Sequence, residues 1–390
     1  MTDARPADVV IIGGGISGTA AAYELARHGV GVTLLEQGDL ASMASGWTLA
    51  GVRQSGRHPA ELPLAMAAVR RWATLDEELG ADVEYRRHGN LRLARTPDEV
   101  PEIERVVAIG KAQGLDLTFL PDNQNVREVA PALSESIVAA SFCPTDGHAN
   151  PTKTVQAFAA AATRHGATIQ TRTTVTGIVA SGGRVTSVRT SDGEIAAGTV
   201  VVAAGIHSAS LVAPFGIDLP LQIGVVAAIQ TMPLPPLISQ VIGVAGADLA
   251  GRQQVDGRLR FTGGGRPWTY DLDNLASSYD LVQPPTSEVA GVVGRVSAVL
   301  PAFADAPLAR VWGGLLDTTP DALPVLERAR AVEGLVLAAG FSGHGFCLGP
   351  VTGQIIRELV IDGRSTLPIE PFTSERFATI RGREAVTLHG

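Results

Sequence analysis

Three glycines and one acid near the start of the chain have the types and spacing needed to hold a dinucleotide. Gly13, Gly15 and Gly18 fit the pattern GxGxxG within "VVIIGGGISG", and Glu36 follows eighteen residues after the last of them. The first glycine allows a tight turn, the second lets backbone approach a pyrophosphate, and the third lets helix and strand pack closely. An acid at this distance can accept the ribose hydroxyls. The pattern predicts a dinucleotide cofactor, and Glu36 argues against NADP without separating NAD from FAD.

A second stretch with chemical potential lies near the end of the chain, in "AAGFSGHGFCLGPVTGQ" at residues 338–354. His344 could face a ligand there, or it could only hydrogen-bond to backbone. Cys347 could support thiol chemistry, but nothing nearby supplies a paired base, so we interpret it as a small buried residue. The residue types alone leave the ligand of this loop open.

The elements around the first glycine motif follow from the hydrophobic pattern. Val9–Ile12 is an apolar, β-branched run, and after the glycines the pattern becomes helical until Gly29. The start of this helix, at Ile16 and Ser17, then faces the anion. "GVTLLE" predicts a second strand that ends in Glu36. Strand, glycines, helix, strand and acid together are a stronger signal than the glycine pattern alone.

The pattern becomes mixed beyond this first unit. Residues 151–166 predict a helix, and residues 167–205 predict strands joined by the turns "SGGR" and "SDGE". Residues 216–320 contain proline-bounded strands with few helical signals between them, which predicts a largely antiparallel sheet. "GLVLAAG" at 334–340 is again a buried strand, and an apolar helix follows the glycine-rich loop.

These patterns predict a mixed α/β fold with two domains. Residues 1–82, 147–215 and 322–390 are expected to form one discontinuous, Rossmann-like nucleotide-binding domain. Residues 83–146 and 216–321 are expected to form an interleaved, mainly antiparallel substrate-binding domain.

Composition argues against several classes of function. The net charge is −8 and no basic run is present, so nucleic acid is not expected as a partner. The eight histidines are dispersed and the two cysteines are Cys143 and Cys347, so we expect neither a metal site nor a disulfide framework. The stretch "VVIIGGGI" lacks a basic leader and is too short to span a bilayer. A cytoplasmic protein without a membrane span is therefore expected.

Four stretches in this order resemble the glycine oxidase, sarcosine oxidase and D-amino-acid oxidase family of FAD-dependent enzymes. They are "VVIIGGGISG", "LAGVRQ", "TVVVAAGIHS" and "WGGLLDTTPDALPVL", the last continuing into "GLVLAAGFSGHGFCLGPVTG". The likeness covers nearly the whole chain. The last stretch particularly resembles the β-subunits of bacterial sarcosine, proline and opine oxidoreductases. The resemblance implies that the predicted Rossmann-like part is a FAD-binding domain.

The resemblance also assigns the glycine-rich loop near the end of the chain. The residues that it implies for holding the isoalloxazine ring are Gly343, His344, Gly345 and Phe346. Glycine suits this place because a side chain would block the approach of the ring. The helix that follows would point its positive end at the pyrimidine side, where reduction of the flavin places negative charge.

Further contacts with FAD are implied by the same likeness. Ser45 lies where the family's loop approaches the pyrophosphate, and Val175 lies where backbone meets adenine. Ala204 and Gly205 belong to the matching stretch "TVVVAAGIHS" and are expected to contact the cofactor as well. Gly314 falls where some relatives attach flavin through cysteine, so the FAD is expected to be non-covalent.

Arg53 in "AGVRQ" matches a substrate-binding arginine of the monomeric sarcosine oxidases, which would hold a substrate carboxylate. A structural ion pair is the alternative for this residue. Two other anchors of relatives are absent, because Leu316 and Cys347 stand where arginine and lysine occur. Replacement anchors could come from the substrate sheet, at Arg258, Arg260 or Arg266.

The chemistry that the resemblance implies is hydride transfer from an amine-bearing carbon to flavin, giving an imine that water hydrolyses. Arg53 and His344 are the residues expected to take part. The substrate types are sarcosine, glycine, D-amino acid, proline or opine, with oxygen as acceptor. Three alternatives stay open: a flavoprotein subunit of a hetero-oligomeric dehydrogenase that reduces a partner or quinone, a non-catalytic flavin-binding module, and a 2-hydroxy-acid oxidoreductase. A homo-oligomer is also compatible with the sequence.

Overall fold

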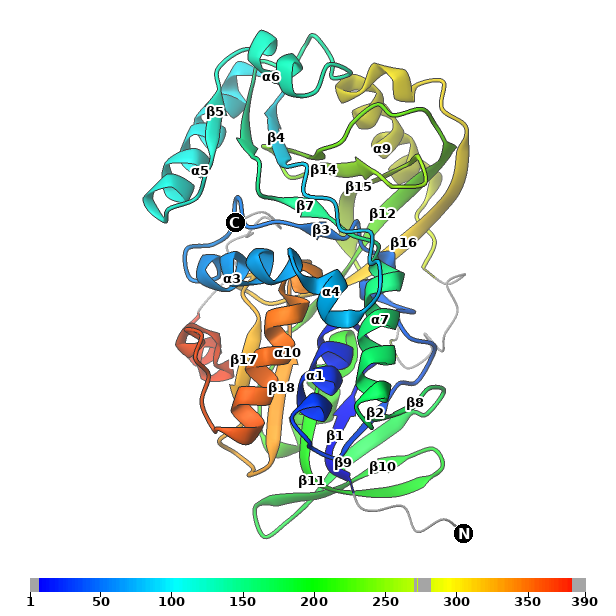
Figure 1. Cartoon of the computed structure of the whole chain (residues 1–390), viewed down its shortest axis with the longest axis vertical. Coiled ribbons are helices and arrows are strands. Elements are labelled where there is room, and N and C mark those ends of the chain that lie inside the picture. Colours follow the sequence, from blue (N-terminus) through cyan, green and yellow to red (C-terminus); the bar gives the residue numbers. More distant parts are fainter. Residues whose placement is uncertain (1–6, 270–271, 273–281, 381–390) are drawn as a thin grey trace.

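A twisted sheet around five parallel strands forms the lower part of the protein in Figure 1. The computed structural model describes residues 7–269, 272 and 282–380. The parallel strands run in the order β18-β11-β1-β2-β8, and β17 closes one edge antiparallel to β18. Strand β11 also continues into an antiparallel meander with β10 and β9. The bounds are β1 Ala7–Ile12, β2 Val32–Leu35, β8 Thr168–Gln170, β9 Val175–Ser181, β10 Arg184–Thr190, β11 Gly193–Val202, β17 Val325–Arg328 and β18 Leu335–Ala339.

A second sheet of eight strands forms the upper part of the same view. Its order is β16-β12-β15-β14-β13-β4-β6-β5, and every neighbouring pair is antiparallel except β13 and β4. A two-stranded ribbon of β3 and β7 is separate from both sheets. The bounds are β3 Gly51–Val52, β4 Asn90–Ala94, β5 Thr118–Leu120, β6 Ala139–Cys143, β7 Gly147–His148, β12 Gln222–Pro233, β13 Val241–Val244, β14 Leu249–Gln253, β15 Arg258–Pro267 and β16 Leu308–Thr318.

Helices cover the parallel sheet and the outer face of the second sheet. Helices α3 and α4 cross the middle of Figure 1, between the two sheets. The α-helices are α1 Ile16–Arg27, α2 Ala44–Trp47, α3 Leu62–Trp72, α4 Leu75–Leu79, α5 Val100–Ala112, α6 Asn123–Val129, α7 Pro151–Arg164, α8 Ser208–Val212, α9 Thr286–Val299 and α10 Gly345–Ile361. Short 3₁₀ helices lie at Pro97–Glu99, Gly205–His207, Ala213–Phe215, Pro301–Phe303, Glu370–Phe372 and Ser374–Ala378.

Strand β1 shows why the first sheet needs covering on both faces. Val9 and Ile11 belong to the core under α1, α7 and α10, whereas Val10 and Ile12 belong to the core on the meander side. All four side chains are buried. A continuous apolar run of this kind is typical of a parallel strand buried on both faces, and alternation of side chains sends successive residues to opposite faces.

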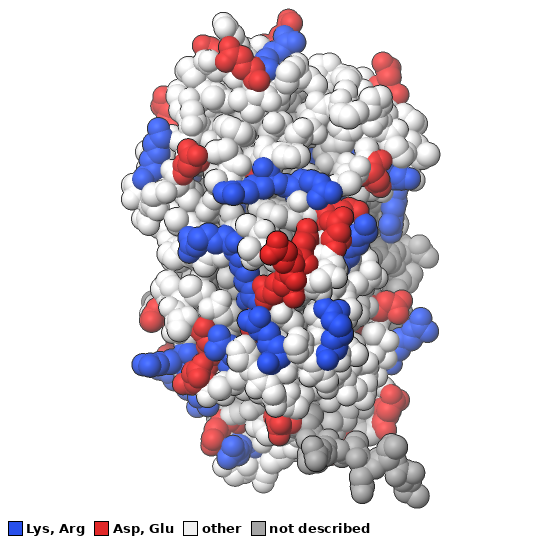
Figure 2. All heavy atoms as spheres, viewed as in Figure 1, with Lys and Arg blue, Asp and Glu red and all other residues white. Residues whose placement is uncertain are grey.

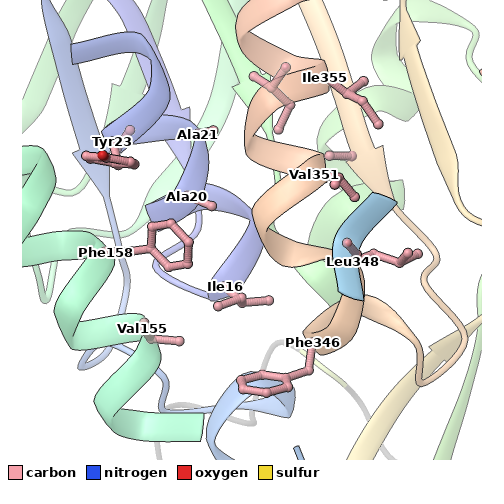
Figure 3. Packing of buried hydrophobic residues seen from close by; sticks show 14 of the residues in the cluster. Ile16, Ala20, Ala21, Tyr23, Val155, Phe158, Phe346, Leu348, Val351 and Ile355 are labelled. Atoms are coloured by element: carbon pink, nitrogen blue, oxygen red, sulfur yellow. The ribbon is translucent and has the colours of Figure 1, made fainter. Parts of the chain in front are cut away.

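Helix α1 lies between α7 and α10, as Figure 3 shows. Its approach to α10 is close because small residues meet there. A Cβ placed on Gly349 would lie 2.2 Å from Ile16 Cγ1, and one on Gly353 would lie 2.6 Å from the backbone carbon of Ala20. The two glycines therefore fix how near α10 stands to the start of α1.

The predicted mixed α/β class is confirmed, with a parallel sheet in one part and a mainly antiparallel sheet in the other. The strands between residues 216 and 320 form the largely antiparallel sheet that was predicted, and one helix that was not predicted, α9, spans fourteen residues there. The predicted domain boundaries stay a prediction, and their ends at residues 1–6 and 381–390 lie outside the described residues.

Candidate functional site

Two neighbouring cavities lie at the carboxyl ends of the parallel strands. The first cavity, of about 700 Å³, is lined by the segments that follow β1, β2 and β11. The second cavity, of about 270 Å³, lies between the first sheet and strands β12 to β16 of the second sheet. Gly15, Ser45, Gly205 and Asp317 line both cavities. Ligands of doubly wound sheets bind in this crevice, and a continuous pair of cavities suits a long cofactor.

The first cavity brings together the residues expected to hold the nucleotide part of a cofactor. Gly13, Gly15, Glu36, Val175 and Ala204 all line it. The Glu36 carboxylate is oriented by backbone, since it accepts the N–H groups of residues 14 and 38 at 2.6 and 2.7 Å. This leaves a fixed acid at the end of β2, where ribose hydroxyls are expected.

Ser45 and the start of α1 meet beside this cavity. The Ser45 hydroxyl accepts the Ile16 N–H at 2.9 Å, and a Cβ on Gly15 would lie 2.9 Å from the same hydroxyl oxygen. Gly15, the residue before the helix, makes no side-chain cap, so the positive end of α1 points toward the cavity wall. Ile16 and Ser17 themselves line the second cavity.

Gly13 and Gly18 allow the tight turn between β1 and α1. Gly13 has φ +114°, and a Cβ there would lie 2.3 Å from the carbonyl oxygen of Ala203. A Cβ on Gly18 would lie 2.0 Å from the carbonyl oxygen of Gly13. Gly18 is not among the described residues that line either cavity. Its place in the motif is explained by packing of the helix against the turn.

The glycine-rich loop after β18 forms one wall of the second cavity. Gly343, His344, Gly345 and Phe346 all line it. The backbone turns through Ser342 at φ +52° and Gly343 at φ +86° before α10 begins. His344 precedes the helix without a side-chain cap. The amino end of a seventeen-residue helix therefore faces the cavity, where its positive end favours negative charge.

His344 is held by a buried acid from α3's amino end. Its Nδ1 lies 2.9 Å from Glu61 Oε2, and both side chains are buried. Burial alone would raise the pKa of Glu61, but His344 and Arg57 nearby lower it to about 2. Burial, with Arg57 next, lowers the pKa of His344 more than Glu61 raises it. A neutral imidazole beside an ionised Glu61 is the arrangement that these directions support.

Arg53 lies where a substrate anchor was expected, on the wall of the second cavity. Its Nη1 donates to the carbonyl oxygens of Ser55 and Gly56, so the guanidinium is fixed by its own loop. Burial, followed by the charges of Arg57 and Arg92, lowers its pKa well below the usual value. A ligand carboxylate would relieve this unfavourable burial.

The suggested replacement anchors on the substrate sheet are engaged elsewhere. Arg258 pairs with Asp256 and Arg266 with Glu288, while Arg260 donates to backbone oxygens of Gly46 and Trp47. None of these three arginines is among the described residues lining the second cavity. Six polar residues that sequence reasoning missed do line it, namely Thr48, Arg57, Asn90, Arg92, Thr262 and Asp317.

A buried acid lies where the two cavities meet. The Asp317 carboxylate accepts the Gly340 N–H at 2.9 Å, so it ties β16 to the end of β18. Burial raises the pKa of Asp317 to about 6, although hydrogen bonds from backbone oppose the rise. Leu316, beside it, also lines the second cavity, and Cys347 is buried with its thiol 3.4 Å from the carbonyl oxygen of Arg53.

Comparison with known proteins identifies the family of the chain and the cofactor on which that family depends. A model of the FAD dependent oxidoreductase family, DAO, matches residues 8–359. The chain belongs to this family. It is 31% identical over 382 residues to the sarcosine oxidase subunit beta of Arthrobacter sp., covering 95% of this chain and 91% of the relative. It is also 28% identical to the glycine oxidase of Geobacillus kaustophilus, with 95% and 97% covered.

Solved structures of family members have the same fold. L-proline dehydrogenase from P. horikoshii superposes with a TM-score of 0.88 at 28% identity, covering 96% of this chain and 98% of that one. Glycine oxidase from Geobacillus kaustophilus gives 0.87 at 26% identity, with 94% and 98% covered. The chain is thus a FAD-dependent oxidoreductase, and the two cavities with their fixed acid, glycine turns and paired helix ends fit FAD.

No helix in the described ranges is long and apolar enough to cross a membrane. Within the same ranges, no group of three or more His, Cys, Asp and Glu could hold a metal ion. Acidic and basic side chains are interspersed on the face shown in Figure 2, which is typical of a solvated surface.

Proposed function

We propose that this enzyme oxidises the C–N bond of an amine or amino acid that carries a carboxylate. The observation that supports this most is the position of Arg53, a half-buried cation that shares the second cavity with the loop Gly343–Phe346. A carboxylate held by Arg53 would keep the rest of the substrate within the same small cavity. Charge-assisted hydrogen bonds to arginine suit this task because they are strong and directional.

The names of the relatives agree with this proposal. They include a sarcosine oxidase subunit, a glycine oxidase and an L-proline dehydrogenase, whose named substrates are amino acids. We therefore extend the substrate types sarcosine, glycine, D-amino acid, proline and opine to this chain as candidates. A 2-hydroxy acid is also a candidate, because hydride transfer from a C–OH carbon needs the same geometry. It is the weaker candidate because the relatives named above act on amino acids.

Bound FAD would supply the redox chemistry by accepting a hydride from the carbon next to the nitrogen of the neutral amine, and water would hydrolyse the resulting iminium ion. The residues of this chain would position the substrate and stabilise the reduced flavin ring. Arg53 holds the carboxylate, and the buried walls keep water out of the reacting region. The amino end of α10 faces the cavity and favours the negative charge of the reduced ring.

His344 is proposed to contribute as a neutral side chain. Its lowered pKa means that it adds no full positive charge beside the substrate at neutral pH. A substrate that enters as an ammonium ion is then not repelled by this residue, and Glu61 fixes the orientation of the ring. We assign His344 to the site on this basis.

Oxygen is the electron acceptor that we favour, and a partner protein or quinone is the alternative. The alternative draws on the relative named as a β-subunit, which supports a role for this chain as the flavoprotein part of a hetero-oligomer. Hydrogen peroxide formed by the purified chain during turnover would support the oxidase, whereas turnover only with an artificial acceptor would support the dehydrogenase subunit.

An anaerobic screen tests the proposal directly. The FAD-loaded protein is mixed with N-methyl amino acids, opines, D-amino acids, prolines and 2-hydroxy acids, and bleaching of the flavin absorbance is followed. We expect at least one amine with a carboxylate to bleach it. Bleaching by hydroxy acids alone would refute the C–N assignment, and bleaching by none of the compounds would favour a flavin-binding module.

Arg53 has its own test within this proposal. Arg53→Ala should weaken binding of a carboxylate substrate by about 1.5 to 3 kcal/mol, because a charge-assisted hydrogen bond is lost. FAD content should stay at the wild-type value. Equal weakening for an amine that lacks the carboxylate would remove Arg53 from this role.

A further inference from the structure

The second sheet presents a row of small residues to the second cavity. Each member is paired directly with the next across neighbouring strands, so all of them share one face of the sheet. From β13 to β12, the row consists of Gly243, Ala250, Thr262 and Ala228. All four residues line the second cavity. Because their side chains are short, they leave room for a ligand against this wall.

Open space lies against the row at its β13 end. A Cβ placed on Gly243 would have no described atom within 4 Å apart from those of its chain neighbours. Gly243, Ala250 and Thr262 are all half-buried, as expected for residues that border a cavity. At the usual spacing of about 4.8 Å between strands, the four-residue row is about 14 Å long. This length suits a chain of several carbon atoms.

The row carries no charge. Thr262 is its one polar member, and the Thr262 hydroxyl donates to the carbonyl oxygen of Ala227 at 2.9 Å, so its proton is used within the sheet. Among the described residues of the second sheet that line the cavity, only Arg92 and Asp317 are charged, and they lie on β4 and β16, on either side of the row. An apolar group against the row would gain from burial, whereas a polar group would lose hydration.

The row begins beside the proposed carboxylate anchor. Gly243 is paired with Arg92 of β4. The Nη1 atoms of Arg92 and Arg53 lie 2.9 and 3.0 Å from the point where a Cβ on Gly56 would stand, so the two guanidinium groups are neighbours. A substrate whose carboxylate is held by Arg53 would therefore have the row within reach of its substituents.

We infer that the substrate is an amino acid with an apolar group of several carbon atoms, which lies against the row from Gly243 to Ala228. This inference rests on the proposed function and narrows its substrate class. The apolar group is attached to the reacting carbon or to the nitrogen. Glycine and sarcosine are too small to cover the row. Gly243 is then a specificity-determining residue, because a larger side chain there would occupy the space that the apolar group needs.

Binding of carboxylates that lack an amine tests this inference without turnover. Acetate, propanoate, butanoate, pentanoate and 4-hydroxybutanoate are each titrated by calorimetry into the FAD-loaded wild-type protein. Removal of one CH₂ group from water strengthens binding by up to about fourfold, so we expect pentanoate to bind at least about tenfold more tightly than acetate. It should also bind more tightly than 4-hydroxybutanoate, which has the same length and a terminal hydroxyl. A smaller rise, an equal affinity for 4-hydroxybutanoate, or no binding of any carboxylate would overturn the inference.

The role of Gly243 is tested by substitution. Gly243 has no positive φ, so a strand-forming valine fits its backbone. Gly243→Val should bring the affinity for pentanoate to within about twofold of that for acetate. The matched control is Gly198→Val on β11, which is exposed, has only ordinary contacts for a Cβ and is not among the described residues lining either cavity. The control should keep the wild-type difference. A Gly243→Val protein that still prefers pentanoate tenfold would overturn the role of this residue, and the wild-type series decides the inference even if the variant does not fold.

Anaerobic bleaching of the flavin shows which atom carries the apolar group. Faster bleaching by N-butylglycine than by sarcosine would place it on the nitrogen, and faster bleaching by either enantiomer of 2-aminohexanoate than by glycine would place it on the carbon.

Failure of this inference can be told apart from failure of the proposed function. Tighter binding of pentanoate together with no bleaching by any amine would reject the function and retain the apolar site. Bleaching by sarcosine or glycine, with equal affinities for acetate and pentanoate, would retain the function and reject the apolar site.

Discussion

Asp317 should make the stability of the protein depend on pH in a way that one substitution can isolate. Its carboxyl group is buried between the two cavities, and burial raises its pKa from 3.8 to about 6. A raised pKa means that the folded state holds a proton that the unfolded chain has already released. The stabilising effect of this proton is complete below the unfolded pKa and is lost as the pH rises through about 6. The whole change is about 3 kcal/mol, from about 1.4 kcal/mol for each pKa unit.

Asp317→Asn removes the titration and keeps the hydrogen bond. The amide oxygen can still accept the Gly340 N–H, so the link between β16 and β18 is preserved. We expect the variant to gain stability relative to wild type by up to about 3 kcal/mol between roughly pH 4 and pH 7. Urea unfolding of the cofactor-free protein, followed by circular dichroism, measures this without a contribution from FAD release.

Asp218→Asn, at an exposed position, controls for the general loss of one negative charge. A stability difference between wild type and Asp317→Asn that stays constant from pH 4 to pH 7 would refute the reasoning. It would mean that Asp317 has the same proton affinity in the folded and unfolded chain.

Three other predictions concern packing, cofactor attachment and the acceptor. Gly353→Ala should cost about 1 to 3 kcal/mol in urea unfolding, because its Cβ would lie 2.6 Å from Ala20 backbone, whereas Gly294→Ala in α9, with open space around it, should be neutral or stabilise by up to about 1 kcal/mol. Acid or heat should release FAD intact, because Gly314 offers no thiol, and flavin that stays on denatured protein would contradict this. Reduced enzyme should react with oxygen more slowly in stopped-flow than lysine-bearing relatives, and turn over faster with an artificial acceptor than in air, since neither Lys111 nor Lys153 lines the second cavity. Reoxidation as fast as in those relatives would show that the missing lysine says nothing about the acceptor.

Short-range patterns predicted much of the fold. The turn glycines, Glu36 and the apolar runs lie within tens of residues of one another, so spacing alone placed them at the end of a parallel strand. Helix α9 was missed because its own sequence argues against a helix. It contains Gly291 and Gly294 and five valines, all poor helix formers, and it forms because Val292 and Val296 pack on the second sheet. Tertiary packing outweighed local propensity there.

In the candidate site, only the residues that lie in motifs resembling the family could be predicted from the sequence. Glu61 and His344 are 283 residues apart, and no local signal connects them. Arg92 did leave a faint signal, since Asn90, Arg92 and Ala94 alternate with two leucines in "NLRLA". That alternation predicts a strand with one polar face, but not that the face points into a cavity. Which element packs opposite the polar face of β4 is decided only when the whole chain folds.

Two buried arginines of the second sheet, Arg252 and the suggested substrate anchor Arg260, support the site although neither is among the described residues that line the second cavity. Arg260 donates to the carbonyl oxygens of Gly46 and Trp47 at 3.1 and 3.0 Å, and Arg252 donates to those of Leu49 and Ala149. These oxygens belong largely to the segment that runs from Ser45 toward Arg53. A guanidinium group suits this task because its five N–H donors can reach several backbone oxygens at once. The sheet thereby positions the loop that links the cofactor cavity to the substrate cavity, which explains why buried arginines are present at positions from which no ligand is reached.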